Sequence, residues 1–245
     1  MEKPFVQVRD LGRIAYDEAL HIQKGILDQL VQLKLANRNR KEAEIKLPVH
    51  QFLFCEHDPV FTLGRTGKED HLLLNEFELQ QESIAFYKTN RGGDITFHGP
   101  GQIVGYPIFD LEFFFTDVHK YVRYIEEGVI RTLADYEIQG DRIKGYTGVW
   151  LKARGDQPER KICAIGIHLS RWISMHGFAF NVNTNLQYFN KIVPCGITDE
   201  DKDVTSLSRE LGYSISLSEV KNRLITHYAE LFNFDFRIED PFYDH

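Results

Sequence analysis

One cysteine of the chain stands where a nucleophile is expected. Cys195 lies between Pro194 and Gly196, at a bend where a side chain can project into a cleft and where backbone N–H groups can stabilise an oxyanion. The alternative is a small buried hydrophobic residue, the commoner role of a cysteine without context. We assign that role to Cys55 and Cys163, which lie inside apolar runs. The pattern favours a thiol enzyme with Cys195 as its nucleophile.

A thiol nucleophile needs a neighbour that favours the thiolate, because an ordinary cysteine is only a few per cent ionised at neutral pH. Lys161 is the candidate, since it opens an apolar segment and its ammonium group would stabilise a nearby thiolate. We expect Lys161 to share a strand face with Cys163, Ile165 and Ile167. The alternative is a lysine whose stem packs on a strand end while its amine stays in water.

The third feature is a glycine-dense turn from Arg91 to Gln102, which contains Gly92, Gly93, Gly99 and Gly101. Backbone without side chains can approach a ligand closely. No Gly-Lys-Ser/Thr sequence follows, so the stretch is not a phosphate-binding P-loop, and a plain hairpin turn would need fewer glycines. The stretch therefore predicts a binding site. We assign lining or structural roles, and no proton transfer, to His98, His168 and His176.

The composition is that of a globular protein. The 245 residues are 42% hydrophobic and carry a formal net charge of −7, which predicts one domain over residues 1–245 and argues against nucleic-acid binding. The first residues lack the features of a signal peptide, and no apolar run approaches the roughly 18 residues of a membrane span. We expect a cytoplasmic protein that does not bind membranes. The three cysteines follow no disulfide or zinc pattern.

One segment differs from the rest in charge. Between Arg142 and Arg171 the chain has seven basic and two acidic residues, a local charge of +5. We expect this segment to form a basic patch that docks an acidic partner.

Hydrophobic periodicity predicts the elements that must position these residues. Helices are expected at 16–35, 116–136, 186–192, 205–211 and 217–232, and strands at 5–8, 49–56, 60–63, 84–89, 102–111, 148–152, 161–169 and 177–182. We expect Thr116 to cap the second helix and Pro107 to mark a sheet edge or a bulge. Strands outnumber helices and follow one another in runs. The sequence therefore predicts an α+β fold, a single domain with a mixed β-sheet flanked by helices.

Taken together, these stretches resemble the lipoyl(octanoyl) transferase family. The resemblance covers the chain from about Phe5 to Leu231 and departs from the family at Cys163, where a small residue is common, and at His168, where a basic residue is frequent. Its five ordered motifs are Arg91-Gly92-Gly93-x-x-Thr96-x-His98-Gly99-Pro100-Gly101-Gln102 with Gly105-Tyr106-Pro107, Arg160-Lys161-Ile162-x-Ala164-Ile165-Gly166, His176-Gly177-Phe178-Ala179-x-Asn181, Ile192-Val193-Pro194-Cys195-Gly196-Ile197 and Val204-Thr205-Ser206-Leu207.

The resemblance implies the fold of the biotin and lipoate protein ligase catalytic domains and a two-step acyl transfer. Cys195 would carry the octanoyl thioester, and Lys161 would lower its pKa and shuttle protons. The donor would be octanoyl acyl carrier protein. The acceptors would be the lipoyl domains of 2-oxoacid dehydrogenases and the glycine cleavage H protein, with no metal or cofactor. The implied substrate contacts are Arg91, Gly92, Gly93, Asp94, Ile95, Thr96, Phe97, His98, Ala164, Ile165, Gly166, Gly177, Phe178 and Ala179.

Two other functions stay open at this point. An ATP-dependent lipoate or biotin ligase of the same fold would use the equivalent of Lys161 on an acyl-adenylate and would need no cysteine. A non-catalytic binder of lipoyl domains or carrier proteins would need neither a thiol nor an amine at the site.

Overall fold

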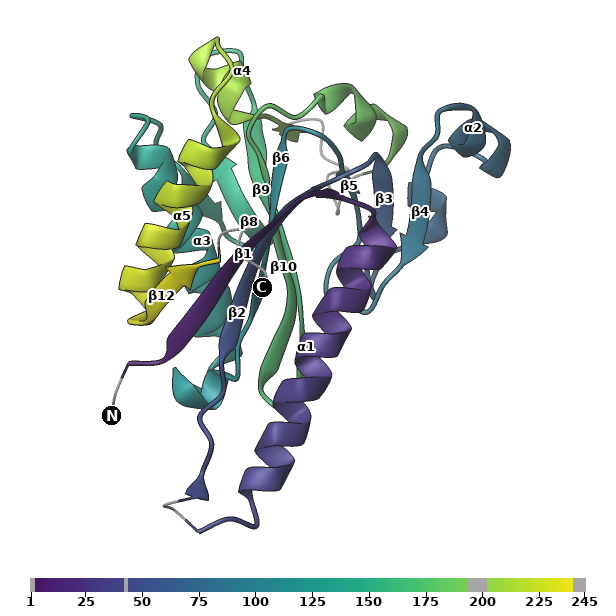
Figure 1. Ribbon diagram of the computed structural model, residues 1–245. Helices are drawn as coiled ribbons and strands as arrows, with labels where there is room; N and C mark the ends of the chain where they lie inside the picture. Colours follow the sequence, from purple (N-terminus) through teal and green to yellow (C-terminus); the bar gives the residue numbers. More distant parts are fainter. Residues whose placement is uncertain (1–2, 42–43, 194–201, 240–245) are drawn as a thin grey trace.

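The protein is described by a computed structural model that covers residues 3–41, 44–193 and 202–239. Within these residues the strands form two sheets (Figure 1). The larger has nine strands: β1 (Phe5–Ile14), β2 (His50–His57), β6 (Gln102–Ile108), β7 (Asp141–Ile143), β8 (Tyr146–Leu151), β9 (Glu159–Ser170), β10 (Ile173–Asn181), β11 (Lys202–Val204) and β12 (Asp235–Ile238). Their order is β12-β1-β2-β6-β10-β9-β8-β7, with β11 paired to β9. The smaller sheet has the order β4-β3-β5, from β3 (Val60–Leu63), β4 (Ala85–Lys88) and β5 (Ile95–His98).

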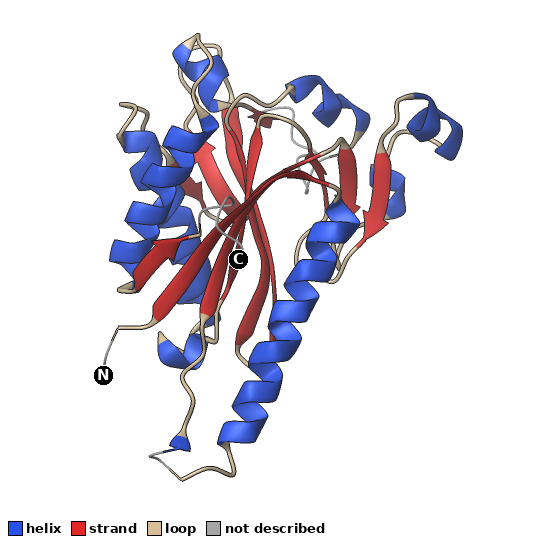
Figure 2. Ribbon diagram, viewed as in Figure 1, coloured by secondary structure: helices blue, strands red, loops and turns tan. Residues whose placement is uncertain are grey.

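Helices cover both faces of the large sheet (Figure 2). The α-helices are α1 (Tyr16–Asn37), α2 (Glu76–Gln81), α3 (Val118–Ala134), α4 (Leu207–Leu211) and α5 (Leu217–Phe232), and the 3-10 helices are η2 (Glu69–His71), η3 (Leu111–Phe113) and η4 (Leu186–Lys191). α3 and α5 pack together on one face, and α1 lies across the other (Figure 1). None of the helices in the described ranges is long and apolar enough to cross a membrane.

Alternation along β2 shows why the sheet can be covered on both sides. Phe52 and Phe54 point into the core shared with α3 and α5, whereas Leu53 and Cys55 point into the core shared with α1. Successive side chains of a strand point to opposite faces of the sheet. An unbroken apolar run is therefore typical of a strand that is buried on both faces. The α+β fold with a mixed sheet is confirmed.

Three local expectations were wrong. The turn expected from Arg91 to Gln102 contains β5, which pairs antiparallel with β3 in the smaller sheet. The cap of α3 is Asp117, whose carboxylate accepts the N–H of Lys120 at 2.9 Å, and not Thr116. Pro107 lies in β6, a central strand and not an edge strand. It is tolerated because the ladder between β6 and β10 ends at Gly105, so no N–H is needed from residue 107 on that side.

The contact between α3 and α5 leads to a prediction about Gly128. A Cβ atom there would lie 2.3 Å from Cε1 of the buried Tyr228 ring. Gly128→Ala is expected to lower the free energy of unfolding by about 1–2 kcal/mol, because overpacking outweighs the roughly 1 kcal/mol gained in helix propensity. Gly25→Ala in α1 is the matched control, since its Cβ would meet no atom within 4 Å. It should raise stability by about 0.5–1 kcal/mol. Urea denaturation of both variants measures the difference, and equal effects would contradict the packing argument.

Candidate active site

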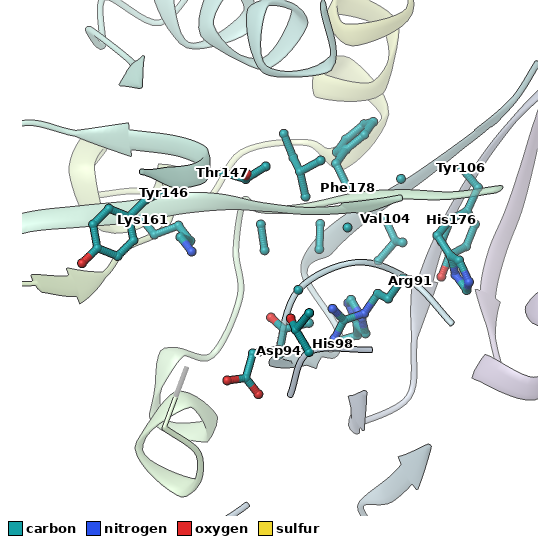
Figure 3. A pocket seen from close by; sticks show the side chains of 18 of the residues that line it. Arg91, Asp94, His98, Val104, Tyr106, Tyr146, Thr147, Lys161, His176 and Phe178 are labelled. Atoms are coloured by element: carbon teal, nitrogen blue, oxygen red, sulfur yellow. The ribbon is translucent and has the colours of Figure 1, made fainter. Parts of the chain in front are cut away.

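A cavity of about 320 Å³ lies where the two sheets meet. Twelve of the sequence-predicted site residues line it: Arg91, Gly93, Asp94, Thr96, His98, Lys161, Ala164, Ile165, Gly166, Gly177, Phe178 and Ala179. They come from β5 and the loop before it, from β9 and from β10. Figure 3 shows Lys161 and Tyr146 at one end of the cavity and Tyr106 and His176 at the other, with Arg91 and His98 between them. The structure therefore gathers into one site segments that are far apart in the chain, such as those of Arg91 and Lys161, which are 70 residues apart.

Three predicted contact residues do not line the cavity. Ile95 and Phe97 point away from it, into the core of the smaller sheet, because they alternate with Thr96 and His98 along β5. Gly92 serves through its backbone, and its N–H donates to the carbonyl of Ile167 at 2.9 Å. Cys195 lies outside the described residues.

Several lining residues were not predicted as site residues. They are Tyr16, Thr66, Val104, Tyr106, Gly145, Tyr146 and Thr147. His176 also lines the cavity, as expected for a lining histidine. Tyr106 belongs to one of the motifs and could have been included on that ground. Tyr16 opens α1, and nothing local to its sequence distinguishes it from an ordinary core tyrosine.

A β-bulge decides what Lys161 and its neighbours face. Val149 and Trp150 are adjacent on β8, yet they pair with Cys163 and Lys161, so Ile162 is an extra residue on β9. Ile162 and Cys163 both point into the core shared with α3 and α5, whereas Lys161 and Ala164 line the cavity. The expectation that Lys161 and Cys163 share a face is therefore wrong. The bulge changes the alternation between them.

The two described cysteines are buried thiols, as predicted for them. Cys55 and Cys163 are fully buried, and burial raises the pKa of each thiol well above its ordinary value. Glu126 adds to the effect on the pKa of Cys163. Since a thiolate is the reactive form, neither sulfur can act as a nucleophile near neutral pH.

A chain of buried hydrogen bonds leads from Arg91 to Gln102. The guanidinium group of Arg91 donates to the hydroxyl oxygen of Thr62 at 2.9 Å, and that hydroxyl lies 3.1 Å from Nε2 of His98. Nδ1 of His98 lies 2.9 Å from Oε1 of Gln102. The amide nitrogen of Gln102 donates to the Phe97 carbonyl. Oε1 of Gln102 must therefore accept, which assigns the proton of His98 to Nδ1 and makes Nε2 the acceptor of the Thr62 hydroxyl.

The chain continues from Gln102 to the strand of Lys161. The Gln102 amide nitrogen also donates to Oδ1 of Asn181 at 2.9 Å, and Asn181 donates to the carbonyl of Thr205 at 3.0 Å. The N–H of Thr205 donates to the carbonyl of Lys161 at 2.9 Å. Residues from four of the five motifs thus meet in one connected network, which fixes the cavity wall at both ends.

The cavity wall toward the end opposite Lys161 holds histidines that are kept neutral. Burial, followed by the nearby His57 and Arg91, holds the pKa of His98 well below its usual range. The pKa of His176 is lowered to about 3, again chiefly by burial and then by Arg91. His176 also adopts φ +60°, while its N–H donates to Gln23 and Nε2 contacts Oδ1 of Asn90 at 2.7 Å. This end therefore presents neutral rings beside one guanidinium group.

Glycine is needed where the two sheets come closest. A Cβ atom on Gly166 would lie 2.7 Å from the carbonyl oxygen of Gly92 and 3.1 Å from Cδ of Arg91. This is too close for a carbon contact, so only glycine lets the Arg91 loop reach β9. The glycine of the motif Ala164-Ile165-Gly166 is therefore required for the close approach of the two sheets, and the motif also lines the cavity.

The segment expected to form a basic patch exposes only part of its positive charge. Lys161 lies in the cavity, Arg160 is buried and pairs with Glu210 at 2.8 Å, and Arg142 pairs with Glu126 and Glu127. Partners from other elements thus neutralise part of the charge excess along the sequence. Among the described residues, no three His, Cys, Asp or Glu side chains are grouped as metal ligands.

Comparisons with known proteins agree with this architecture. A family model described as the lipoyl protein ligase A/B catalytic domain matches residues 27–229. The chain is 52% identical over 227 residues to an octanoyltransferase of Cytophaga hutchinsonii, covering 93% of this chain and 92% of that protein. It is 51% identical to an octanoyltransferase of Flavobacterium johnsoniae, covering 93% and 96%. The fold resembles a bipartite lipoate protein ligase of Thermoplasma acidophilum, with a TM-score of 0.64, 16% identity and coverage of 98% of this chain and 87% of that one.

The buried histidines predict acid lability. The pKa of His50 is lowered to about 4 and that of His176 to about 3, so the unfolded chain takes up protons below about pH 6.5 that the folded protein excludes. Stability is present above that pH and is lost as the pH falls toward the folded values. Each of these two histidines should lower the free energy of unfolding by about 2 kcal/mol as the pH falls from 7 to 5.

Urea denaturation at both pH values measures this loss. His176→Asn tests the contribution of one group, since asparagine tolerates a positive φ and does not titrate. The pH-dependent loss should shrink by about 2 kcal/mol in that variant. An unchanged loss would contradict the assignment of a neutral buried imidazole.

Proposed function

The chain belongs to the lipoyl protein ligase A/B catalytic-domain family and, within it, to the octanoyltransferases, and from this premise we propose the route of its reaction. Octanoyl acyl carrier protein is the donor, Cys195 carries the octanoyl group as a thioester, and the target lysine of a lipoyl domain is the acceptor. Lys161 is the basic partner of Cys195. The cavity between the two sheets holds the acyl chain.

The observation that carries the proposal is the position of the two described segments that precede and follow Cys195 in the sequence. The N–H of Val193 donates to the carbonyl of His71 at 2.7 Å, and Nδ1 of His71 lies 2.5 Å from a carboxylate oxygen of Asp94, which lines the cavity. On the other side, Val204 in β11 pairs directly with Lys161. Two residues of extended chain span about 7 Å at most. The described chain stops two residues before Cys195, at a segment bonded through His71 to the cavity-lining Asp94.

The first half-reaction moves the acyl group to the enzyme. The Cys195 thiolate attacks the carbonyl carbon of the donor thioester, and a tetrahedral oxyanion forms. The C–S bond to the carrier then breaks, and the departing thiolate takes a proton from the Lys161 ammonium group. The donor is already an activated acyl thioester, so this step needs no ATP. The ammonium group of Lys161 favours the attacking thiolate by charge before it gives up its proton.

The second half-reaction moves the acyl group to the acceptor. The neutral amine of the target lysine attacks the thioester carbonyl, and Lys161, now also a neutral amine, accepts the proton that the attacking nitrogen loses. An amide forms as the C–S bond breaks, and Cys195 leaves as a thiolate. Thiolate and ammonium are restored together, so the pair returns to its starting protonation and titrates as a coupled unit.

The cavity supports the binding of a medium-length acyl chain. Ala164 and Ala179 face each other across β9 and β10, and Val104 and Phe178 add further apolar lining. Burial of an acyl chain gains about 0.8 kcal/mol for each CH₂ group. The small alanine side chains therefore leave the space that the chain fills.

A covalent adduct tests the route. After mixing with octanoyl acyl carrier protein, intact mass and peptide mapping should find one octanoyl group on Cys195, and Cys195→Ala should carry none. Cys163→Ala is the matched control, because its buried thiol plays no part and the adduct should persist. Lys161→Met should slow adduct formation about 100-fold or more, the size of a lost acid–base contribution. Acyl transfer that survives in Cys195→Ala and depends on ATP would overturn the proposal in favour of a ligase.

Cavity size should set the preferred chain length. Ala164→Val adds two methyl groups to the wall, and we expect the ratio of octanoyl to hexanoyl transfer to fall about tenfold, because two CH₂ groups lose burial worth about 0.8 kcal/mol each. Competition between the two acyl donors measures this ratio. Ala153→Val, at an exposed position of the β8–β9 loop, is the control and should leave the ratio unchanged. A ratio unaltered by Ala164→Val would place the acyl chain elsewhere.

A further inference from the structure

Two aromatic rings on β8 lie between two lysine ammonium groups at the end of the cavity that holds Lys161. Nζ of Lys161 lies 4.7 Å from the centre of the Trp150 ring, and Nζ of Lys202 lies 4.9 Å from the centre of the Tyr146 ring. The two rings contact each other edge to face, with centres 5.7 Å apart and planes at 70°. The order Lys202, Tyr146, Trp150, Lys161 therefore forms a continuous layer of cations and rings.

The backbone dictates this arrangement. Tyr146 and Trp150 both lie on β8, and Gly148 between them adopts φ +123° where the pairing of β8 with β7 is irregular. The bulge at Ile162 pairs Trp150 directly with Lys161. Gly148 lets β8 lie close to β9, since a Cβ atom there would lie 2.5 Å from the carbonyl oxygen of Cys163 and 3.7 Å from Cε of Lys161. Local geometry thus brings the indole face to the lysine.

The contact lies away from solvent, where such contacts are strongest. Trp150 is 0% exposed and Lys161 is 8% exposed. Among the described residues, Nε1 of Trp150 has no hydrogen-bond partner. A hydrogen bond from the indole N–H therefore does not hold this side chain in place. The ring face, which carries the negative end of the quadrupole, is the part that meets the ammonium group.

We propose that Trp150 is a positioning residue of the acyl transfer, whose ring face holds the Lys161 ammonium group at the end of the cavity. The proposal rests on the role of Lys161 given under the proposed function. The ring stabilises the charged lysine in a site from which water is largely excluded, and it fixes the direction in which the lysine offers its proton. A tryptophan that only fills space would be indifferent to the electron density of its ring.

Ring fluorination separates these two roles, because fluorine changes the shape of the indole little while it weakens the quadrupole step by step. The chain has two tryptophans, and the second, Trp172, lies in the tight turn between β9 and β10. Trp172→Phe therefore gives an enzyme in which incorporated mono-, di-, tri- and tetrafluorotryptophan occupies position 150 alone. We expect the rate of octanoyl-enzyme formation to fall progressively, by about three- to thirtyfold across the series. A rate independent of fluorination would overturn the proposal.

Two controls separate the outcomes. Trp150→Phe with fluorotryptophan retained at position 172 should show no dependence on fluorination, and it sacrifices no hydrogen bond at Nε1. The ¹⁹F resonance of fluorotryptophan at position 150 should shift when Lys161 is replaced by Met, whether or not the enzyme is active. An unmoved resonance would overturn the contact itself. An unlabelled Trp172→Phe enzyme that forms no acyl adduct would instead count against the proposed function, while the ¹⁹F comparison still decides the position of Lys161.

Discussion

The site depends on one extra residue in one strand. Without the bulge at Ile162, regular alternation along β9 would direct Lys161 and Cys163 to the same face. Either the amine would enter the apolar core at a cost of several kcal/mol, or the thiol would enter the cavity beside it. The bulge lets β9 contribute Ile162 and Cys163 to the core and Lys161 and Ala164 to the cavity in consecutive residues.

The second constraint is the junction of the two sheets, which positions the cavity wall formed by Arg91 and its neighbours. Arg91 binds the smaller sheet through the carbonyl of Thr62 at 2.5 Å, and the following Gly92 binds the larger sheet through Ile167. This junction is buried, so its polar groups must all find partners. The hydrogen bonds through His98, Gln102 and Asn181 provide them and end on the strand of Lys161. The polar motifs of the sequence therefore build the wall on which an apolar ligand can lie.

Much of this could be predicted from the sequence because it depends on local patterns. The helix at Tyr16–Asn37 and the helix at Leu217–Phe232 follow from apolar spacing, and the glycines of the Arg91 loop indicate close approach. α2 was missed although Asn75 and Glu78 form a capping box, a signal that is visible in the sequence. The bulge at Ile162 could not be predicted, because it is a property of the pairing of β9 with β8. The paired charges of Arg142 and Arg160 were hidden for the same reason, since their partners lie 16 and 50 residues away.

Neutral histidines suit the proposed role of the cavity, which is to accept an uncharged acyl chain beside the proposed pair of Cys195 and Lys161. A protonated imidazole at His98 or His176 would place a second cation next to Arg91 in a buried region, so burial and repulsion both favour the neutral ring. The cost is stability that is lost in acid. The benefit is a wall that hydrogen-bonds to its own backbone and side chains and carries little charge into the cavity. On the proposed route, the charge that acyl transfer needs is supplied at the opposite end, where Lys161 lies against Trp150.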